Sequence, residues 1–125
     1  MKRYRGASVV MARNNNGRVT PPHPGSILRD RVLPGLELTI SQAARELRIA
    51  RQTLHRVLAG TAAVTPEMAI RLARLSDTAP TFWLDLQQQH DLWHAERALA
   101  GVLTLIPTHT LPGNVKSEIG RPYDR

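Results

Sequence analysis

Apolar residues recur every three or four positions from residue 23 to about residue 100, which is the spacing of amphipathic helices. The pattern predicts five helices, each with one face turned towards a shared core. The first helix begins in the string HPGS, whose proline suits a first helical turn, and it ends at Pro34 and Gly35. Its predicted core positions are Ile27, Leu28 and Val32, with Arg29 and Asp30 facing outwards.

The second and third predicted helices form one unit, residues 39–60, in which a three-residue turn joins them. Thr39 and Gln42 have the spacing of a capping box, where each side chain bonds the backbone amide of the other. The third helix covers about Arg51–Leu58, and Gly60 follows where a left-handed conformation ends a helix. The side chains expected to be buried are Ile40, Ala43, Ala44, Leu47, Leu54, Val57 and Leu58.

Two further helices complete the pattern. The fourth begins at Thr65-Pro66-Glu67, an N-cap followed by a proline and an acid, and its apolar side comprises Met68, Ile70, Leu72, Ala73 and Leu75. The fifth runs from near Pro80 to about Ala100 and is the longest. Its apolar stripe exceeds what four short helices can cover, so we expect part of it to contact a second copy. The residues assigned to this dimer interface are Phe82, Trp83, Leu86, His90 and Trp93.

The two ends of the chain lack this periodicity. Residues 1–22 are basic and polar, and we expect a flexible tail that either follows a phosphate backbone or is simply disordered. In residues 101–125 prolines interrupt a short alternating stretch, so the sequence is compatible with either a short strand or an extended arm. The predicted fold is therefore all-α: a five-helix domain, residues 23–100, between irregular tails.

The distribution of charge along the chain indicates the kind of partner that it binds. The net charge of +7 is concentrated: residues 1–18 hold five basic residues and no acid, and residues 39–60 hold four against Glu46 alone. Such a distribution favours a polyanion partner over a basic face kept for solubility. The chain has no cysteine and no apolar run near the roughly 18 residues that span a bilayer, and its N-terminus does not resemble a signal peptide. We expect a soluble, cytoplasmic protein without a membrane partner.

The unit at residues 39–60 has the spacing of a helix-turn-helix, which presents its second helix to the major groove of DNA. Arginine forks onto guanine and glutamine onto adenine, so Arg51, Gln52 and Arg56 are suited to read base edges. His55 lies on the same predicted face. The candidate phosphate contacts are Thr39, Ser41 and Gln42 at the start of the second helix, with Thr53 and Thr61. The alternative is a helical module whose third-helix face binds protein.

Catalytic and metal-binding patterns are weak. His90 and His94 have a spacing that can ligate zinc, but no third ligand is evident. Asp85 and Asp91 fall on different helix faces, the serines lack a nucleophile context, and there is no glycine-rich phosphate loop. We expect no metal, no cofactor and no enzymatic activity.

The chain resembles the HigA family of antitoxins within the lambda-repressor-like helix-turn-helix superfamily. The strings that carry the resemblance are HPGSILRD, SQAARELRIARQTLHRVLAG, TPEMAIRLAR and PTFWLDLQQQHDLW, over about residues 23–96. The resemblance implies a homodimer that represses its own operon at an inverted repeat and binds a small ribonuclease toxin of the HigB type. It also places Ala50, Arg51, Gln52, Thr53 and Arg56 at DNA-contacting positions. A stand-alone regulator without a toxin is the alternative.

Two residues depart from the family pattern. Arg48 stands where the turn usually has glycine, so we expect a positive φ there at a cost of roughly 1 kcal/mol. Ala50 stands where the recognition helix usually has a serine N-cap, which loses on the order of 1 kcal/mol. Neither departure prevents the fold, and the methyl group of Ala50 is able to contact a thymine methyl.

Overall fold

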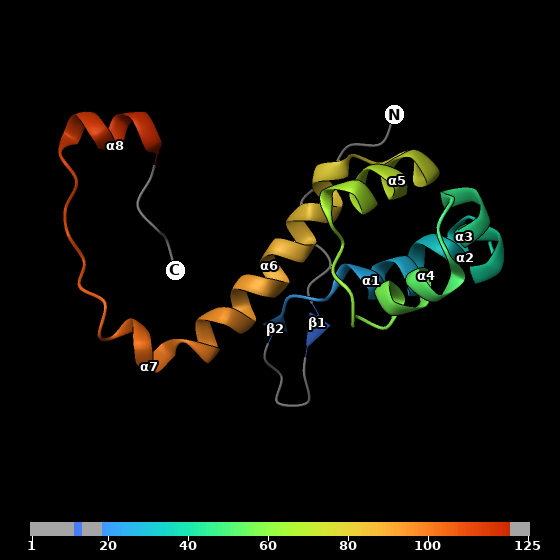
Figure 1. Cartoon of the computed structure of the whole chain (residues 1–125), viewed down its shortest axis with the longest axis horizontal. Helices are drawn as coiled ribbons and strands as arrows, with labels where there is room; N and C mark the ends of the chain where they lie inside the picture. The colour runs from blue at the N-terminus through green and yellow to red at the C-terminus, as the bar shows by residue number, and fades with distance from the viewer. Residues whose placement is uncertain (1–11, 14–18, 121–125) are drawn as a thin grey trace.

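Five helical segments enclose one core, as the periodicity predicts, and a short arm follows them (Figure 1). The computed structural model describes residues 12–13 and 19–120. The core segments comprise α1 (Pro24–Ile27) with η2 (Leu28–Val32) and α2 (Leu33–Gly35), α3 (Ile40–Leu47), α4 (Arg51–Leu58), α5 (Pro66–Ser76) and α6 (Pro80–Ala98). The remaining elements are strands β1 (Ala12–Arg13) and β2 (Val19–Thr20) and helices α7 (Ala100–Leu103) and α8 (Gly113–Ile119).

The first segment is a single helical rod in which η2 forms a wider, π-helical turn. The backbone N–H of Leu33 donates to the carbonyl of Leu28, five residues earlier. Pro34 follows directly, and a proline inside a helix has no N–H to donate and crowds the carbonyl before it. The shift in register buries Leu33 beside Leu28, whereas Ile27 and Val32, predicted for the core, are half-buried.

The core is formed mainly by aliphatic side chains from α3, α4, α5 and the first rod, closed by the N-terminal half of α6. Trp83 is its largest fully buried side chain, and its indole N–H donates to the Thr78 hydroxyl at 2.9 Å. The predicted burial of Leu54, Val57 and Leu58 on α4 is confirmed. The prediction for Ile70 is wrong: α5 faces the core with Ala69 instead, and Ile70 is 61% exposed.

One buried polar side chain ties the loop before α5 to the long helix. Gln87 on α6 accepts a hydrogen bond from the backbone N–H of Val64 at 2.7 Å and donates to Asp91 at 2.9 Å. Loss of such a bond is costly, because a buried amide left without a partner carries an uncompensated desolvation penalty. The loop that carries Val64 is therefore held against α6.

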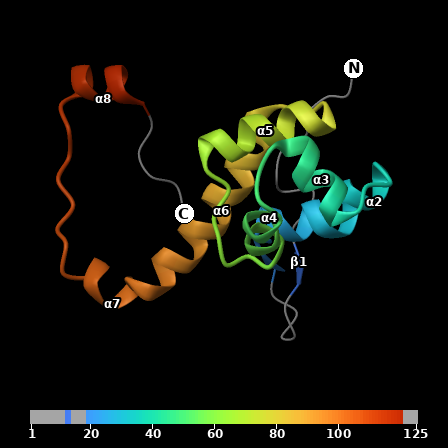
Figure 2. The ribbon, with the colours of Figure 1, turned by 45° about the vertical axis from the view of Figure 1, so that its right-hand side comes forward.

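The two ends depart from expectation. Ala12 pairs with Thr20 and Arg13 with Val19 in a small antiparallel ladder, whereas no strand was predicted there; the rest of the predicted tail up to residue 18 lies outside the described residues. Residues 101–119 form neither a strand nor a fully extended arm, because α7 and α8 interrupt them. The segment from α7 to α8, called the arm below, stands apart from the five-helix domain in both views (Figures 1 and 2). Within the described ranges, no helix combines the length and apolar character needed to cross a bilayer.

Candidate nucleic-acid interface

Helix α4 is fixed along one side and open along the other. Leu54, Val57 and Leu58 are buried, and Leu54 is fully enclosed. The residues on the opposite side that are exposed are Arg51, Gln52, Thr53, His55 and Arg56. A rod held in this way presents its polar side chains without itself being free to rotate.

The exposed side chains of α4 are partly ordered by one another. The Arg51 Nε–H donates to Nε2 of His55, one helical turn later, at 3.3 Å. This bond uses Nε2 of the imidazole as an acceptor, so the ring is neutral when it forms. The terminal nitrogens of Arg51, which form the fork that recognises guanine, take no part in this bond.

Helix α3 begins with the predicted capping box, which is confirmed. The Gln42 N–H donates to the Thr39 hydroxyl oxygen at 3.1 Å, and the Thr39 N–H donates to Oε1 of Gln42 at 2.9 Å. The box leaves the amides of Ile40 and Ser41 without an acceptor inside the helix, since their partners would lie before its start. These two amides, beside the exposed Ser41 hydroxyl, are suited to one phosphate.

The turn between α3 and α4 has the strain expected from its sequence. Arg48 adopts φ 61° and ψ 42°, the left-handed region, and Ala50 precedes α4 without a side-chain cap. At the other end of α4, Gly60 has φ 77°, as predicted. The Thr61 hydroxyl donates to the carbonyl of Arg56 at 3.2 Å, so its proton is already engaged within the chain.

The string HPG anchors α4 from the first rod, a role the sequence did not reveal. A Cβ atom on Gly25 would lie 1.8 Å from the carbonyl oxygen of Val57, so α1 touches the backbone of α4 directly. His23 caps α1 by accepting the Gly25 N–H on Nδ1 at 2.9 Å, and burial lowers the pKa of His23, which favours the neutral acceptor. The only signal was a glycine in a first helical turn, where it is otherwise unfavourable.

The residues predicted for a dimer interface separate into two groups. Trp83 and Leu86 are enclosed by the chain's own helices, so their side chains belong to the core and cannot meet a second copy. Phe82, His90 and Trp93 are half-buried. The ring of His90 packs edge-on against His23, and the guanidinium of Arg97 lies 3.5 Å from the centroid of Trp93.

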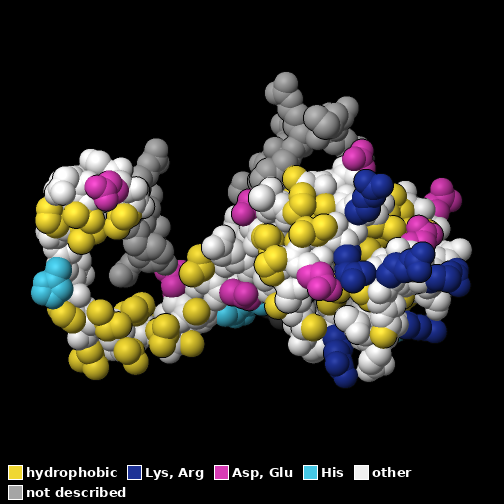
Figure 3. Space-filling view, turned by 45° about the horizontal axis from the view of Figure 1, so that its top comes forward, with side chains coloured by type: hydrophobic (Ala, Val, Ile, Leu, Met, Phe, Trp, Pro, Cys, Tyr) yellow, Lys and Arg dark blue, Asp and Glu magenta, His cyan; other side chains and the backbone are white. Residues whose placement is uncertain are grey.

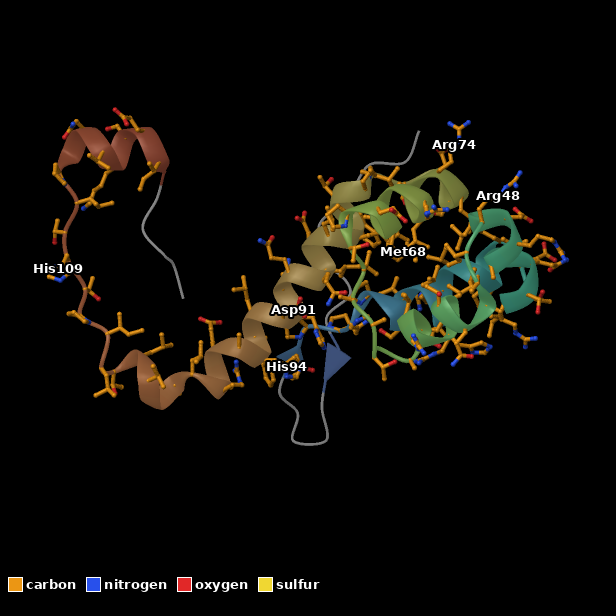
Figure 4. All side chains as sticks on the ribbon, viewed as in Figure 1. Arg48, Met68, Arg74, Asp91, His94 and His109 are labelled. Atoms are coloured by element: carbon orange, nitrogen blue, oxygen red, sulfur yellow. The ribbon has the colours of Figure 1, made fainter. Side chains whose placement is uncertain are left out.

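The histidines on α6 form a ring cluster. His90 and His94 have centroids 4.5 Å apart, and His90 also lies 3.2 Å from a carboxylate oxygen of Asp91. Figure 4 shows Asp91 and His94 at mid-length on α6, near the two short strands. Among the described residues, no three His, Asp or Glu side chains are grouped so as to hold a metal ion.

Basic side chains gather on the five-helix domain (Figure 3). In this view, several dark blue Lys and Arg groups lie on the right-hand part of the domain, among white and yellow surface and a few acidic groups, whereas apolar side chains are conspicuous on the arm. The domain and the arm therefore present surfaces of different chemistry, the first suited to a polyanion.

Comparison with known proteins agrees with this geometry. Residues 28–83 match the family model described as Helix-turn-helix. An uncharacterized HTH-type transcriptional regulator of Haemophilus influenzae is 41% identical over 76 residues, which are 61% of this chain and 71% of the relative. The antitoxin HigA of Pseudomonas aeruginosa, solved with the higBA promoter, is 32% identical at a TM-score of 0.67, covering 73% of this chain and 99% of that one.

A second solved structure extends the likeness. The addiction module antidote protein of a HigA family from Coxiella burnetii is 30% identical at a TM-score of 0.67, covering 73% of this chain and 99% of that chain. The chain belongs to the HigA family of helix-turn-helix DNA-binding regulators.

Proposed function

We propose that this chain is a dimeric repressor that binds an inverted repeat in its own operator and is the antitoxin of a ribonuclease toxin. The observation that carries the DNA-binding part is the exposed face of α4, opposite the buried Leu54. Two copies related by a two-fold axis would place their α4 helices in successive major grooves, about one DNA turn apart.

Base reading is assigned to Arg51, Gln52 and Arg56, which share the outer face of α4 at helical spacing. Ala50 and His55 border this face, the first at the N-cap and the second bonded to Arg51. Arg and Gln supply the forked donors and acceptors that distinguish guanine and adenine in the major groove.

Phosphate contacts are assigned to Thr39, Ser41 and Gln42, with Thr53 on α4. The capping box uses the Thr39 oxygen as an acceptor and leaves its hydroxyl proton available, and Gln42 keeps its amide donors. Thr61 takes part only if its hydroxyl exchanges the Arg56 carbonyl for a phosphate oxygen. Contacts of this kind set the register of the protein on DNA without reading sequence.

Replacing Arg51 or Gln52 by alanine is expected to weaken binding to operator DNA by about 1–3 kcal/mol while sparing most affinity for random DNA, because a base-reading contact is lost. Fluorescence anisotropy measures this on two duplexes of equal length: the region upstream of the chain's own reading frame, and a random sequence.

The matched control is Arg45→Ala on α3, an exposed arginine off the α4 face, which removes the same charge. It should weaken both duplexes alike. Equal losses on both duplexes for Arg51→Ala would contradict the base-reading assignment. A shallow dependence of affinity on salt, or no DNA binding at low salt, would favour the protein-interaction alternative.

The dimer is supported by apolar surface that the chain leaves uncovered. Phe82 and Trp93 are half-buried, and further exposed apolar residues continue along α6 and the arm. These are Leu92, Leu99, Val102, Leu105 and Ile106. Residues 98–115 contain no Lys, Arg, Asp or Glu, so two copies of this basic chain meet there without charge repulsion.

The antitoxin assignment rests on the family, whose solved members include proteins described as antitoxins. Purification from the native cells, with light scattering to measure mass, is expected to give two copies of the chain together with a small basic protein. That protein should cleave RNA only after it is separated from the complex. A dimer of this chain alone would favour the stand-alone regulator, and a monomer at operator-binding concentrations would contradict the dimer.

A further inference from the structure

The turn that orients α4 lacks both residues that ordinarily stabilise such a turn. Arg48 occupies the left-handed region with φ 61°, where a side chain is unfavourable. Ala50 has no hydroxyl with which to cap α4. The angle between α3 and α4 is therefore set by a segment that its own sequence does not favour.

A side chain from another helix holds this segment. Arg71 on α5 donates from Nη1 to the carbonyl of Leu47 at 2.6 Å and lies 3.4 Å from the carbonyl of Arg48. Its Nε lies 3.4 Å from a carboxylate oxygen of Glu67, one turn earlier. The carbonyls that accept from Arg71 lie at the C-terminal end of α3. The last carbonyls of a helix have no backbone N–H partner within it and carry partial negative charge, so they favour a positively charged donor.

Arg71 is itself held in place. Leu72, the next residue, is 1% exposed, and Met68 and Ala69 on the preceding turn are also buried. These contacts fix the position of α5 in the core, and Arg71 extends from it to the turn. The contact spans 24 residues of sequence and joins the turn to a helix whose buried face belongs to the core.

We propose that Arg71 is the positioning residue of the DNA-binding unit: it holds Arg48 in the left-handed conformation and so fixes the angle at which α4 enters the major groove. Arg71 acts through the turn and makes no base contact. The proposal rests on the proposed DNA-binding function and adds to it a residue outside the helix-turn-helix.

The test compares Arg71→Met, which keeps the apolar stem but removes charge and donors, with Arg74→Met. Arg74 lies three residues later on α5 and projects into solvent (Figure 4). Its replacement by methionine therefore removes the same charge without removing a contact to the turn. Arg71→Met is expected to lower affinity for the upstream duplex about tenfold, the scale of a lost charged hydrogen bond, and Arg74→Met less than about threefold. Random DNA should respond to the two variants alike.

Rescue separates positioning from charge. Arg48→Gly removes the penalty of the left-handed region, since glycine adopts it freely. Adding Arg71→Met to Arg48→Gly is expected to cost less than about threefold on the upstream duplex, instead of about tenfold. The same tenfold loss in both backgrounds would overturn the proposal.

Amide hydrogen exchange without DNA gives a second readout. Arg71→Met should speed exchange at Ile49, whose N–H bonds the carbonyl of Ala44 at 3.0 Å across the turn, while amides in the middle of α6 keep their protection. If Arg71→Met does not fold, Arg71→Lys replaces it, with Arg74→Lys as control, and a partial loss is expected because lysine keeps the charge but not the fork.

The outcomes distinguish the two claims. Faster exchange at the turn with unchanged preference for the upstream duplex would overturn the positioning role alone. A wild-type protein that binds upstream and random DNA equally would overturn the proposed function, and this role with it.

Discussion

Trp83→Ala is expected to destabilise the domain by about 3–5 kcal/mol, which is most of the stability of a typical small domain. Trp83 is 0% exposed, packs edge-on against Phe82 with ring centroids 5.1 Å apart and donates to Thr78. Alanine would leave a large cavity in the core and would also remove the indole N–H that donates to the Thr78 hydroxyl. Urea unfolding followed by circular dichroism measures the loss.

Trp93→Ala provides the matched control, because it is the same substitution in the C-terminal half of the same helix, α6. Trp93 is only half-buried, and one face of its ring is covered by Arg97. We expect a loss of about 1 kcal/mol for this variant at fixed protein concentration. Comparable losses for both tryptophans would mean that α6 contributes to stability chiefly through the dimer and not through the core described above.

Gly25→Ala is expected to destabilise the domain by about 1–3 kcal/mol, although alanine favours a helix more than glycine does. The added Cβ would lie 1.8 Å from the Val57 carbonyl oxygen, so α1 and α4 must move apart. The displacement reaches α4, the helix proposed to read bases, so affinity for the upstream duplex should fall with stability. Thermal unfolding and anisotropy on the same sample measure the two effects.

Gly35→Ala is the control with the opposite expected sign. Nothing lies within 4 Å of a Cβ placed at Gly35, and its φ is not positive. Alanine there should leave stability unchanged or raise it by about 0.5–1 kcal/mol. If Gly25→Ala behaves like Gly35→Ala, the close approach of α1 to α4 is not part of the folded state.

The sequence predicted what depends on neighbours along the chain. The capping box of Thr39 and Gln42, the left-handed Arg48 and the two faces of α4 were all expected and are all observed. Each follows from residues at most a few positions apart, so spacing and propensity decide it. The family resemblance then gave the expectation that this exposed face binds DNA.

The sequence did not reveal which partner covers an apolar stripe. Along α6 the same periodicity includes Trp83, enclosed in the chain's own core, and Trp93, half-open. Ile70 has the character of a core residue but lies exposed, because α5 turns Ala69 inwards. Periodicity gives the direction of a face and contains no information on what lies opposite it.

Hydrogen bonds between distant segments were also out of reach. Arg71 reaches a turn 24 residues earlier, and Gln87 holds an amide 23 residues earlier. Neither residue type nor spacing marks such a contact, since exposed arginines and glutamines on helices are common. The structure supplies these contacts, and with them the supports of the candidate interface.

The conformation of Arg48 has a consequence at the level of the genetic code. Every arginine codon differs from a glycine codon by a single base, so the residue that relaxes this turn is one mutational step away. A population selected for repression after Arg71→Met is therefore expected to yield Arg48→Gly among its suppressors. A single base change in the codon of Arg48, which has a left-handed conformation, would thus compensate for loss of the hydrogen bond that Arg71 donates to the turn.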